Sequence, residues 1–344
     1  MSIEYKFLSE SDITEEQYYA FLKKAYGNKA RHKFEERFPW FKQNKNYRIL
    51  LALSGGDIIG QACAYEVEVI ANGKEIPLTW GVDNVVLPEA RGKGVGKTLQ
   101  KILHESSPNF SSVWYSHTNG HIKRKCGAKC FIPNRFPYYA VSKFFGIYVE
   151  IAYNLLFKRN IRLSSGIPFL YYKLFNINKR KDLILTEVSE FSPEHIRFIQ
   201  ESLEMNYDFY VKRDKEYLEW KYYDNPTIKG YHIIEVKRKN EIVAIVSFTN
   251  VQERSFVRTN YSGATILDVF IKDEQAFSRK NAFQVVADYY KKKGIVLDGI
   301  STIFDIPNLA RINYPRKGMP FLSTYKGNIN KPYLSFMDQD MEQI

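Results

Sequence analysis

The stretch Arg91–Leu99 combines three glycines with three basic side chains, directly after an apolar run and at the start of a helical pattern. Glycine allows left-handed backbone conformations that expose successive N–H groups. The N-terminus of a helix attracts negative charge, and lysine and arginine add cationic hydrogen-bond donors. These residue types, in this order, predict a cradle for a phosphate-bearing ligand.

The spacing of the glycines separates three kinds of phosphate loop. A nucleoside-triphosphate loop requires a glycine five residues before its Gly-Lys-Thr, but Arg91 stands at that position before residues 96–98. A dinucleotide loop requires G-x-G-x-x-G, whereas these glycines follow one another at every second position. The pattern that remains is R-x-x-G-x-G, placed after a strand and opening a helix.

This motif, with its lead-in Asn84–Ala90, resembles the acyl-CoA pyrophosphate loop of the GNAT acyltransferases. The resemblance implies an acyl-CoA cosubstrate, with acetyl-CoA expected first, in a gap between the fourth and fifth strands. Backbone groups of Val85, Val86 and Leu87 would pair with its pantetheine arm. Asn119, after the fifth strand, would contact the cofactor or else cap the next helix. The pyrophosphate would be held by the loop residues Arg91, Gly92, Lys93, Gly94, Val95, Gly96 and Lys97.

Acyl transfer to an amine needs a base for the amine's proton and an acid for the leaving thiolate. The resemblance implies direct attack on the thioester, without an acyl-enzyme. Asp83, on the strand before the loop, is the predicted base or an orienting carboxylate, and His117 is the second candidate for the base. The tyrosine acid of GNAT enzymes has no counterpart at its usual place, where Lys123–Lys125 stand. Tyr138 and Tyr139 are more distant substitutes.

Helices and antiparallel hairpins are predicted to position the loop in the first half of the chain. Apolar residues at helical spacing indicate helices over 14–27 and 32–44, and Gly27 is expected to end the first. Alternating apolar runs from 47 to 87 indicate three strands, with tight turns at 54–57 and 72–74. The remaining expected elements are a helix to about residue 105, a strand over 111–118, a helix over 119–127 and a strand over 128–133.

The same order of elements recurs in the second half without the glycine loop. The expected elements are a strand over 183–191, a capped helix over 192–204, a helix over 215–226, a hairpin over 231–250 turned at Lys239-Asn240, a strand over 264–271, a helix over 276–294, and strands over 296–304 and 333–340. The predicted fold class is therefore α/β (α+β), with two GNAT-like domains that each have a mixed, mostly antiparallel sheet flanked by helices. The expected bounds are 1–135 for the first domain, 136–182 for an aromatic and basic connector, and 183–344 for a degenerate second domain.

The second domain is expected to shape the acceptor site. Trp220 is a candidate for stacking on a sugar ring, and Asp268 and Asp338 are candidates for orienting a cationic or hydroxyl-rich acceptor. A core tryptophan and solvated acids at strand ends are the plainer interpretations. Residues 217–226 and the end of the chain also resemble tandem GNAT proteins that are found with bacterial surface-polysaccharide genes.

Composition limits the partners and the compartment. The net charge of +12 favours polyanionic ligands such as CoA phosphates, nucleotide-linked sugars or anionic lipid, and no DNA-reading element accompanies it. Three cysteines are too few for a disulfide framework, so a cytoplasmic location is predicted. No metal is expected, because the spacing of a zinc site is absent from the four candidate ligands Cys126, Cys130, His117 and His121. The basic, aromatic segment around 144–182 is predicted not to span a membrane, although it could lie on an anionic surface.

Three functions follow, in order of preference. The first is acyl-CoA-dependent N-acylation of a small amine, such as an amino sugar of a cell-surface polysaccharide or a nucleotide-linked sugar. The second is aminoacyl transfer of the FemABX type, which uses charged tRNA and suits the positive charge, although the intact loop argues against a tRNA donor. The third is a non-enzymatic acyl-CoA sensor, which the missing tyrosine would explain.

Overall fold

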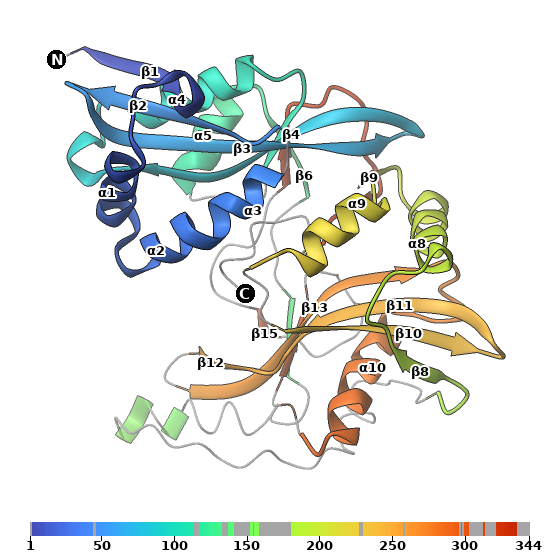
Figure 1. Cartoon of the computed structure of the whole chain (residues 1–344). Helices are drawn as coiled ribbons and strands as arrows, with labels where there is room; N and C mark the ends of the chain where they lie inside the picture. Colours follow the sequence, from blue (N-terminus) through green and yellow to red (C-terminus); the bar gives the residue numbers. More distant parts are fainter. Residues whose placement is uncertain are drawn as a thin grey trace.

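The computed structural model describes residues 2–43, 46–112, 117–132, 137–140, 152–153, 155–157, 180–226, 230–256, 259–295, 297, 299–302, 312–313 and 321–335. Two mixed sheets lie one above the other, each flanked by helices (Figure 1). The predicted fold class is confirmed.

The first sheet has the order β1-β2-β3-β4-β5-β16-β6. Its strands are β1 (Ile3–Phe7), β2 (Arg48–Ser54), β3 (Asp57–Ala71), β4 (Lys74–Val86), β5 (Phe110–Ser112), β6 (Lys129–Ile132) and β16 (Phe321–Ser323). Strands β9 (Phe209–Val211) and β17 (Pro332–Tyr333) extend it beside β3. Neighbours along this path are antiparallel except β4 and β5, which are parallel. Asn72 and Gly73 both have positive φ, 52° and 74°, in the predicted turn between β3 and β4.

Helices cover both faces of the first sheet because β2 and β3 are apolar on both sides. Leu51 and Tyr65 share a core with one group of helices, which comprises α1 (Glu15–Tyr26), α2 (Ala30–His32), a π-helical turn (Lys33–Arg37) and α3 (Phe38–Gln43). Leu50 and Ala64 face α4 (Val95–Glu105) on the other side. Short 3-10 helices cover Leu8–Glu10, Gly27–Lys29 and Pro88–Ala90, and α5 spans His117–Lys125. The capping box of Thr14 begins α1, and Gly27, with φ 57°, ends it as predicted.

The second sheet repeats this plan, in the order β15-β7-β14-β13-β11-β10-β8. Its strands are β7 (Pro137–Ala140), β8 (Ile184–Glu187), β10 (Tyr231–Arg238), β11 (Glu241–Thr249), β12 (Gln252–Phe256), β13 (Thr259–Ile271), β14 (Gly299–Ser301) and β15 (Ile312–Asn313). Its helices are α8 (Pro193–Asn206), α9 (Lys215–Leu218) with a following π-helical turn (Glu219–Tyr223), and α10 (Arg279–Lys292). β13 and β14 are parallel, as β4 and β5 are in the first sheet. A capping box at Ser192 begins α8, the counterpart of α1.

The two sheets exchange a strand. β16, from the C-terminal part of the chain, lies between β5 and β6, while β7 lies between β14 and β15. The sheets therefore depart from the expected bounds, because β7 falls inside the expected connector and β9, β16 and β17 join the first sheet. Strands pair through backbone hydrogen bonds, which strands of many sequences can form, so local composition did not reveal this pairing.

A pair of tryptophans joins the two halves, where α3 and α9 lie between the sheets (Figure 1). The indole N–H of Trp40 donates to the carbonyl of Trp220 at 2.9 Å, and the indole N–H of Trp220 donates to the carbonyl of Trp40 at 3.1 Å. The rings stack with centroids 4.8 Å apart. Buried Lys221 lies over the same rings and donates to the Tyr65 hydroxyl at 3.1 Å. The two tryptophans thus make the same contact with each other, as residues related by a local two-fold axis do.

Candidate active site

The glycine loop adopts the conformation that its sequence predicts. A 3-10 turn leads into it, and α4 begins directly after Gly94. Gly92 and Gly94 have φ of 79° and 81°, and a Cβ added at either position would meet no atom within 4 Å. The Arg91 Nε donates to the carbonyl of Val86 at 3.1 Å, which ties the loop to the end of β4. Open space therefore lies in front of two glycines at a helix N-terminus.

A β-bulge separates β4 from β5 beside this loop. Asp83 and Asn84 together face Ala62 on β3, and Asp83 has a φ of 46°. A bulge bends its strand and increases the local twist. Among the described residues, β4 pairs with β5 at Thr79 and Trp80, before the bulge. The bulge therefore lies at the C-terminal end of β4, beside the loop.

A cavity of about 550 Å³ lies beside the bulge and reaches the loop. Nine of the expected cofactor residues line it: Val85, Val86, Arg91, Gly92, Gly94, Val95, Gly96, Lys97 and Asn119. Reasoning from the sequence missed seven others: Gln61, Ala62, Asn84, Ala90, Leu99, Gln100 and Ile122. Of these, Leu99 and Gln100 were recognisable as helix residues one turn beyond the loop, whereas Gln61 and Asn84 depend on the strand pairing.

Two expected cofactor residues do not line the cavity. Leu87 is 2% exposed, packs in the core and donates its backbone N–H to the carbonyl of Ile59. Lys93 is exposed at the tip of the loop.

Asp83 belongs to a buried ionic network rather than to open solvent. Its carboxylate is 2.7 Å from the Lys33 ammonium and 3.5 Å from the Arg37 guanidinium, and both cationic side chains are 1% exposed. The Gln61 amide donates to the backbone carbonyl of Asp83 at 3.3 Å and accepts a hydrogen bond from the Tyr18 hydroxyl. The π-helical turn after α2 presents Lys33 and Arg37 together.

This network sets the ionisation of Asp83. Burial alone would raise the pKa of its carboxyl, but the Arg37 and Lys33 charges outweigh burial and hold the pKa below its ordinary value. A carboxylate with a lowered pKa is a weak base at neutral pH. The geometry therefore argues against the expectation that Asp83 accepts the amine's proton. The sequence could not reveal its partners, which lie about fifty residues away in the chain.

His117 does not end a strand, as was expected, but begins α5. Its side chain lies outside the described residues. Asn119 is accordingly inside the first turn of α5, on the wall of the cavity.

Lys123, four residues beyond Asn119 on the same face of α5, is buried. Its ammonium nitrogen is 2.5 Å from the Ser112 hydroxyl, and His104 of α4 and Cys126 lie nearby. Burial lowers the pKa of Lys123 to about 7, against a small opposing effect of Cys126. Burial and the nearby Lys123 lower the pKa of His104 to about 4. Both side chains are thus largely uncharged above neutral pH.

Lys123→Met should make stability less dependent on pH. Between about pH 7 and the ordinary lysine pKa of about 10.4, the unfolded chain binds a proton that the folded chain lacks, so this lysine makes wild-type stability rise with pH. The advantage of Lys123→Met should therefore shrink by up to about 1.4 kcal/mol per pH unit in this window. Urea unfolding at pH 7 and pH 9 measures it, with exposed Lys125→Met as the matched control. A pH-independent difference would show that Lys123 stays charged.

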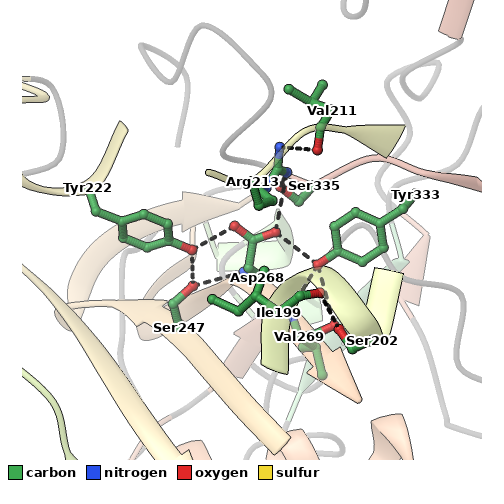
Figure 2. A network of polar contacts seen from close by, with 10 residues as sticks. All are labelled: Ile199, Ser202, Val211, Arg213, Tyr222, Ser247, Asp268, Val269, Tyr333 and Ser335. Atoms are coloured by element: carbon green, nitrogen blue, oxygen red, sulfur yellow. Dashed lines mark hydrogen bonds and ion pairs between the residues drawn. The ribbon is translucent and has the colours of Figure 1, made fainter. Parts of the chain in front are cut away.

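The expected acceptor residues of the second half do not face the cavity. Asp268 is fully buried, and it accepts hydrogen bonds from the Tyr222 hydroxyl at 2.6 Å and the Tyr333 hydroxyl at 2.9 Å (Figure 2). The Arg213 guanidinium is 3.8 Å from the same carboxylate. Trp220 is 8% exposed and stacks on its partner tryptophan in the interface. Neither side chain lines the cavity, and the burial of Trp220 agrees with the core interpretation. Asp338 lies outside the described residues.

The Asp268 network is the second-half counterpart of the Asp83 network. Arg213 precedes Trp220 by seven residues, as Lys33 precedes Trp40. Lys33 faces Asp83 on β4, and Arg213 faces Asp268 on β13, the equivalent strand of the second sheet. Each aspartate lies at a register shift of its strand. In the second half, phenol groups surround the carboxylate (Figure 2). The duplicated position therefore holds a buried aspartate with cationic partners in both halves.

The described residues contain no group of three or more His, Cys, Asp or Glu that could hold a metal ion. His117 and Cys130 were two of the four residues considered as zinc ligands, and their side chains lie outside the described part of the chain. Among the helices that the structure describes, none has both the length and the apolar character needed to cross a membrane.

Comparison with known proteins agrees with the fold and the loop. Residues 4–113 match the family model of the acetyltransferase (GNAT) domain. No curated protein sequence matches the chain. The GCN5-related N-acetyltransferase of Anabaena variabilis is similar in structure, with a TM-score of 0.58 and 13% identity over 93% of this chain and 72% of that one.

Two further solved structures resemble the whole chain. A tandem GNAT protein from the clavulanic acid biosynthesis pathway has a TM-score of 0.52 and 11% identity over 95% of this chain and all of its own. The N-myristoyltransferase of Saccharomyces cerevisiae, solved with bound myristoyl-CoA, has a TM-score of 0.51 and 11% identity over 95% of this chain and 83% of that one.

The comparisons identify the first half and the overall fold. Residues 4–113 match the GNAT acetyltransferase domain. The two halves share the fold of a tandem GNAT protein.

Proposed function

We propose that the protein transfers the acyl group of an acyl-CoA, in first place acetyl-CoA, to the amine of a small acceptor. The cavity between the bulge of β4 and the glycine loop carries this proposal. Its loop end offers backbone N–H groups at a helix N-terminus and the side chains of Arg91 and Lys97, which suit a pyrophosphate. Gln100 and Asn84 also line the cavity.

The residues of the site position the reactants. When bound, acyl-CoA supplies an activated thioester. The loop would hold its phosphates, and the bulge keeps β4 and β5 apart so that the arm can pass between them. His117, which begins the helix that carries Asn119, is the proposed base, because the ordinary pKa of a histidine lies near neutrality. Asp83 is proposed to hold Lys33, Arg37 and the bulge in place.

The proposed acceptor is an amino sugar of a surface polysaccharide, free or linked to a nucleotide, acylated in the cytoplasm. The net charge of +12 favours an acceptor that carries phosphate. Acylation would convert the cationic amine of the acceptor into a neutral amide. This positively charged protein would therefore repel the product less than it repels the substrate. A panel that includes polyamines and amino acids would show whether sugars are preferred.

Titration calorimetry should find one CoA per chain, because only the first half has the R-x-x-G-x-G loop. Acetyl-CoA should bind at the same site, and bulk tRNA should not compete with it. Release of the free thiol, followed with the panel of amines, would then identify the acceptor. Two CoA sites per chain would contradict the degeneracy of the second half. Binding of tRNA without CoA would favour the FemABX-type alternative.

A further inference from the structure

A second cavity, of about 480 Å³, lies in the second half of the chain between β8 and α10. Two segments that are far apart in the sequence form its walls: residues 180–185, which lead into β8, and the C-terminal part of α10. None of its described lining residues belongs to the cavity beside the glycine loop. The proposed acyl transfer therefore makes no use of it.

Positive charge is concentrated in this second cavity. Arg180 and Lys181 line it from the β8 side, and Lys291 and Lys292 line it from α10. Asp288 is the one carboxylate among the described lining residues, so the walls carry three net positive charges. Lysines near the C-terminus of a helix offset its dipole. That effect does not explain why the segment before β8 brings two more cations to the same place.

The lysines of this cavity are not neutralised by neighbouring acids. Within the part of the chain that the structure describes, Lys181, Lys291 and Lys292 form no ion pair. Asp182, which follows Lys181 directly, pairs instead with Arg238 at 2.7 Å. A cleft lined by charges of one sign concentrates their field and attracts ions of the opposite sign. The cavity therefore favours an anion.

Hydrogen bonds hold the wall beside these lysines in place. The Arg180 guanidinium donates to the carbonyl of Ala276 at 2.7 Å and to that of Gln275 at 3.0 Å. The side chain of Gln284, which is 3% exposed, accepts from the backbone N–H of Arg180 at 3.2 Å and donates to its carbonyl at 3.0 Å. The segment that carries Lys181 is thus fixed against α10 without a ligand, which lowers the entropic cost of binding one.

The rest of the lining narrows the chemistry of the ligand. Leu183, Leu185 and Val285 add apolar surface next to the cations. Lysine ammonium groups bind phosphate as point charges, and the volume of the cavity lies in the range of small-molecule sites. A ligand that suits this lining joins a phosphate to an apolar or planar part.

We propose that the cavity between β8 and α10 binds a phosphate group that is attached to an apolar or planar part, with Lys181, Lys291 and Lys292 as its cationic partners. The site is separate from the glycine loop and does not depend on the proposed acyl transfer. A soluble nucleotide and the headgroup of an anionic lipid share this chemistry, and the experiment below distinguishes the two sources.

The test titrates inorganic pyrophosphate into the full chain with CoA in excess, so that the glycine loop is occupied. One pyrophosphate site should remain in wild type. Lys291→Gln and Lys292→Gln should each weaken it about fivefold, through the loss of one charge-assisted contact. Lys293→Gln is the matched control, because the Lys293 ammonium donates to the Tyr289 hydroxyl and this residue does not line the cavity. Equal weakening in all three variants, or no pyrophosphate bound by wild type, would overturn the proposal.

Two further measurements identify the source of the phosphate. If it is a nucleotide, uridine diphosphate should bind more tightly than pyrophosphate, and Lys291→Gln should weaken both. If it is a lipid, the protein should sediment with phosphatidylglycerol vesicles and not with phosphatidylcholine vesicles, and Lys291→Gln should reduce this binding while Lys293→Gln preserves it. Pyrophosphate binding without either preference would contradict the apolar or planar part of the proposed ligand.

Discussion

Asp83→Asn should lower the free energy of unfolding by about 3–5 kcal/mol, the usual effect of removing one partner from a buried ion pair. The variant would remove a negative partner from the Lys33 and Arg37 side chains, each 1% exposed. Urea denaturation at pH 7 measures the change. Because the folded-state pKa of Asp83 is lowered, this stabilisation is present above the ordinary carboxyl pKa of about 4 and is lost as the pH falls below it. The difference between variant and wild type should shrink accordingly at acidic pH.

Two other variants make the result specific. Glu35→Gln, in the same π-helical turn, breaks only the exposed ion pair with Arg31 and should change stability little. His117→Asn should leave stability near wild type but lower kcat by roughly 10²–10³, the range for loss of a general base. An Asp83→Asn variant that is as stable as wild type but has kcat lowered by roughly 10²–10³ would contradict this assignment and identify Asp83 as the base.

Gly94→Asp should weaken CoA binding at least about thirtyfold, or about 2 kcal/mol, the scale of a lost charge-assisted site. The added carboxylate would enter the open space in front of α4, where the phosphates are proposed to lie, and repel them. The fold should survive, because aspartate tolerates the left-handed backbone of Gly94 better than most residues do. Titration calorimetry with CoA and circular dichroism would measure the two effects.

Gly73→Asp provides the comparison. Gly73 also has a left-handed backbone, with φ 74° and free space around its Cβ position, but it lies in the hairpin turn between β3 and β4. This variant should carry a similar backbone strain and bind CoA as wild type does. A folded Gly94→Asp variant that binds CoA normally would show that the loop is not the phosphate cradle.

Sequence alone determined the features that depend on neighbouring residues. The spacing of Arg91, Gly92 and Gly94 predicted a loop that turns into a helix and faces open space, and the structure has this loop. The turn at Asn72-Gly73 and the stop at Gly27 follow from local backbone preferences. The repeated order of elements predicted two similar halves, because periodicity and turn residues are read within a few positions.

The tertiary structure decided everything that depends on distant partners. Asp83 was found at the expected strand, but the ionisation of a carboxylate is set by charges within a few ångström, and Lys33 and Arg37 approach it only in the fold. The sequence left Trp220 as either a sugar-stacking residue or a core residue, and packing against Trp40 buries it. The exchange of β7 and β16 likewise arises from contacts between segments far apart in the chain. Pairing across such distances depends on how whole sheets and helices pack, which no short window of sequence contains.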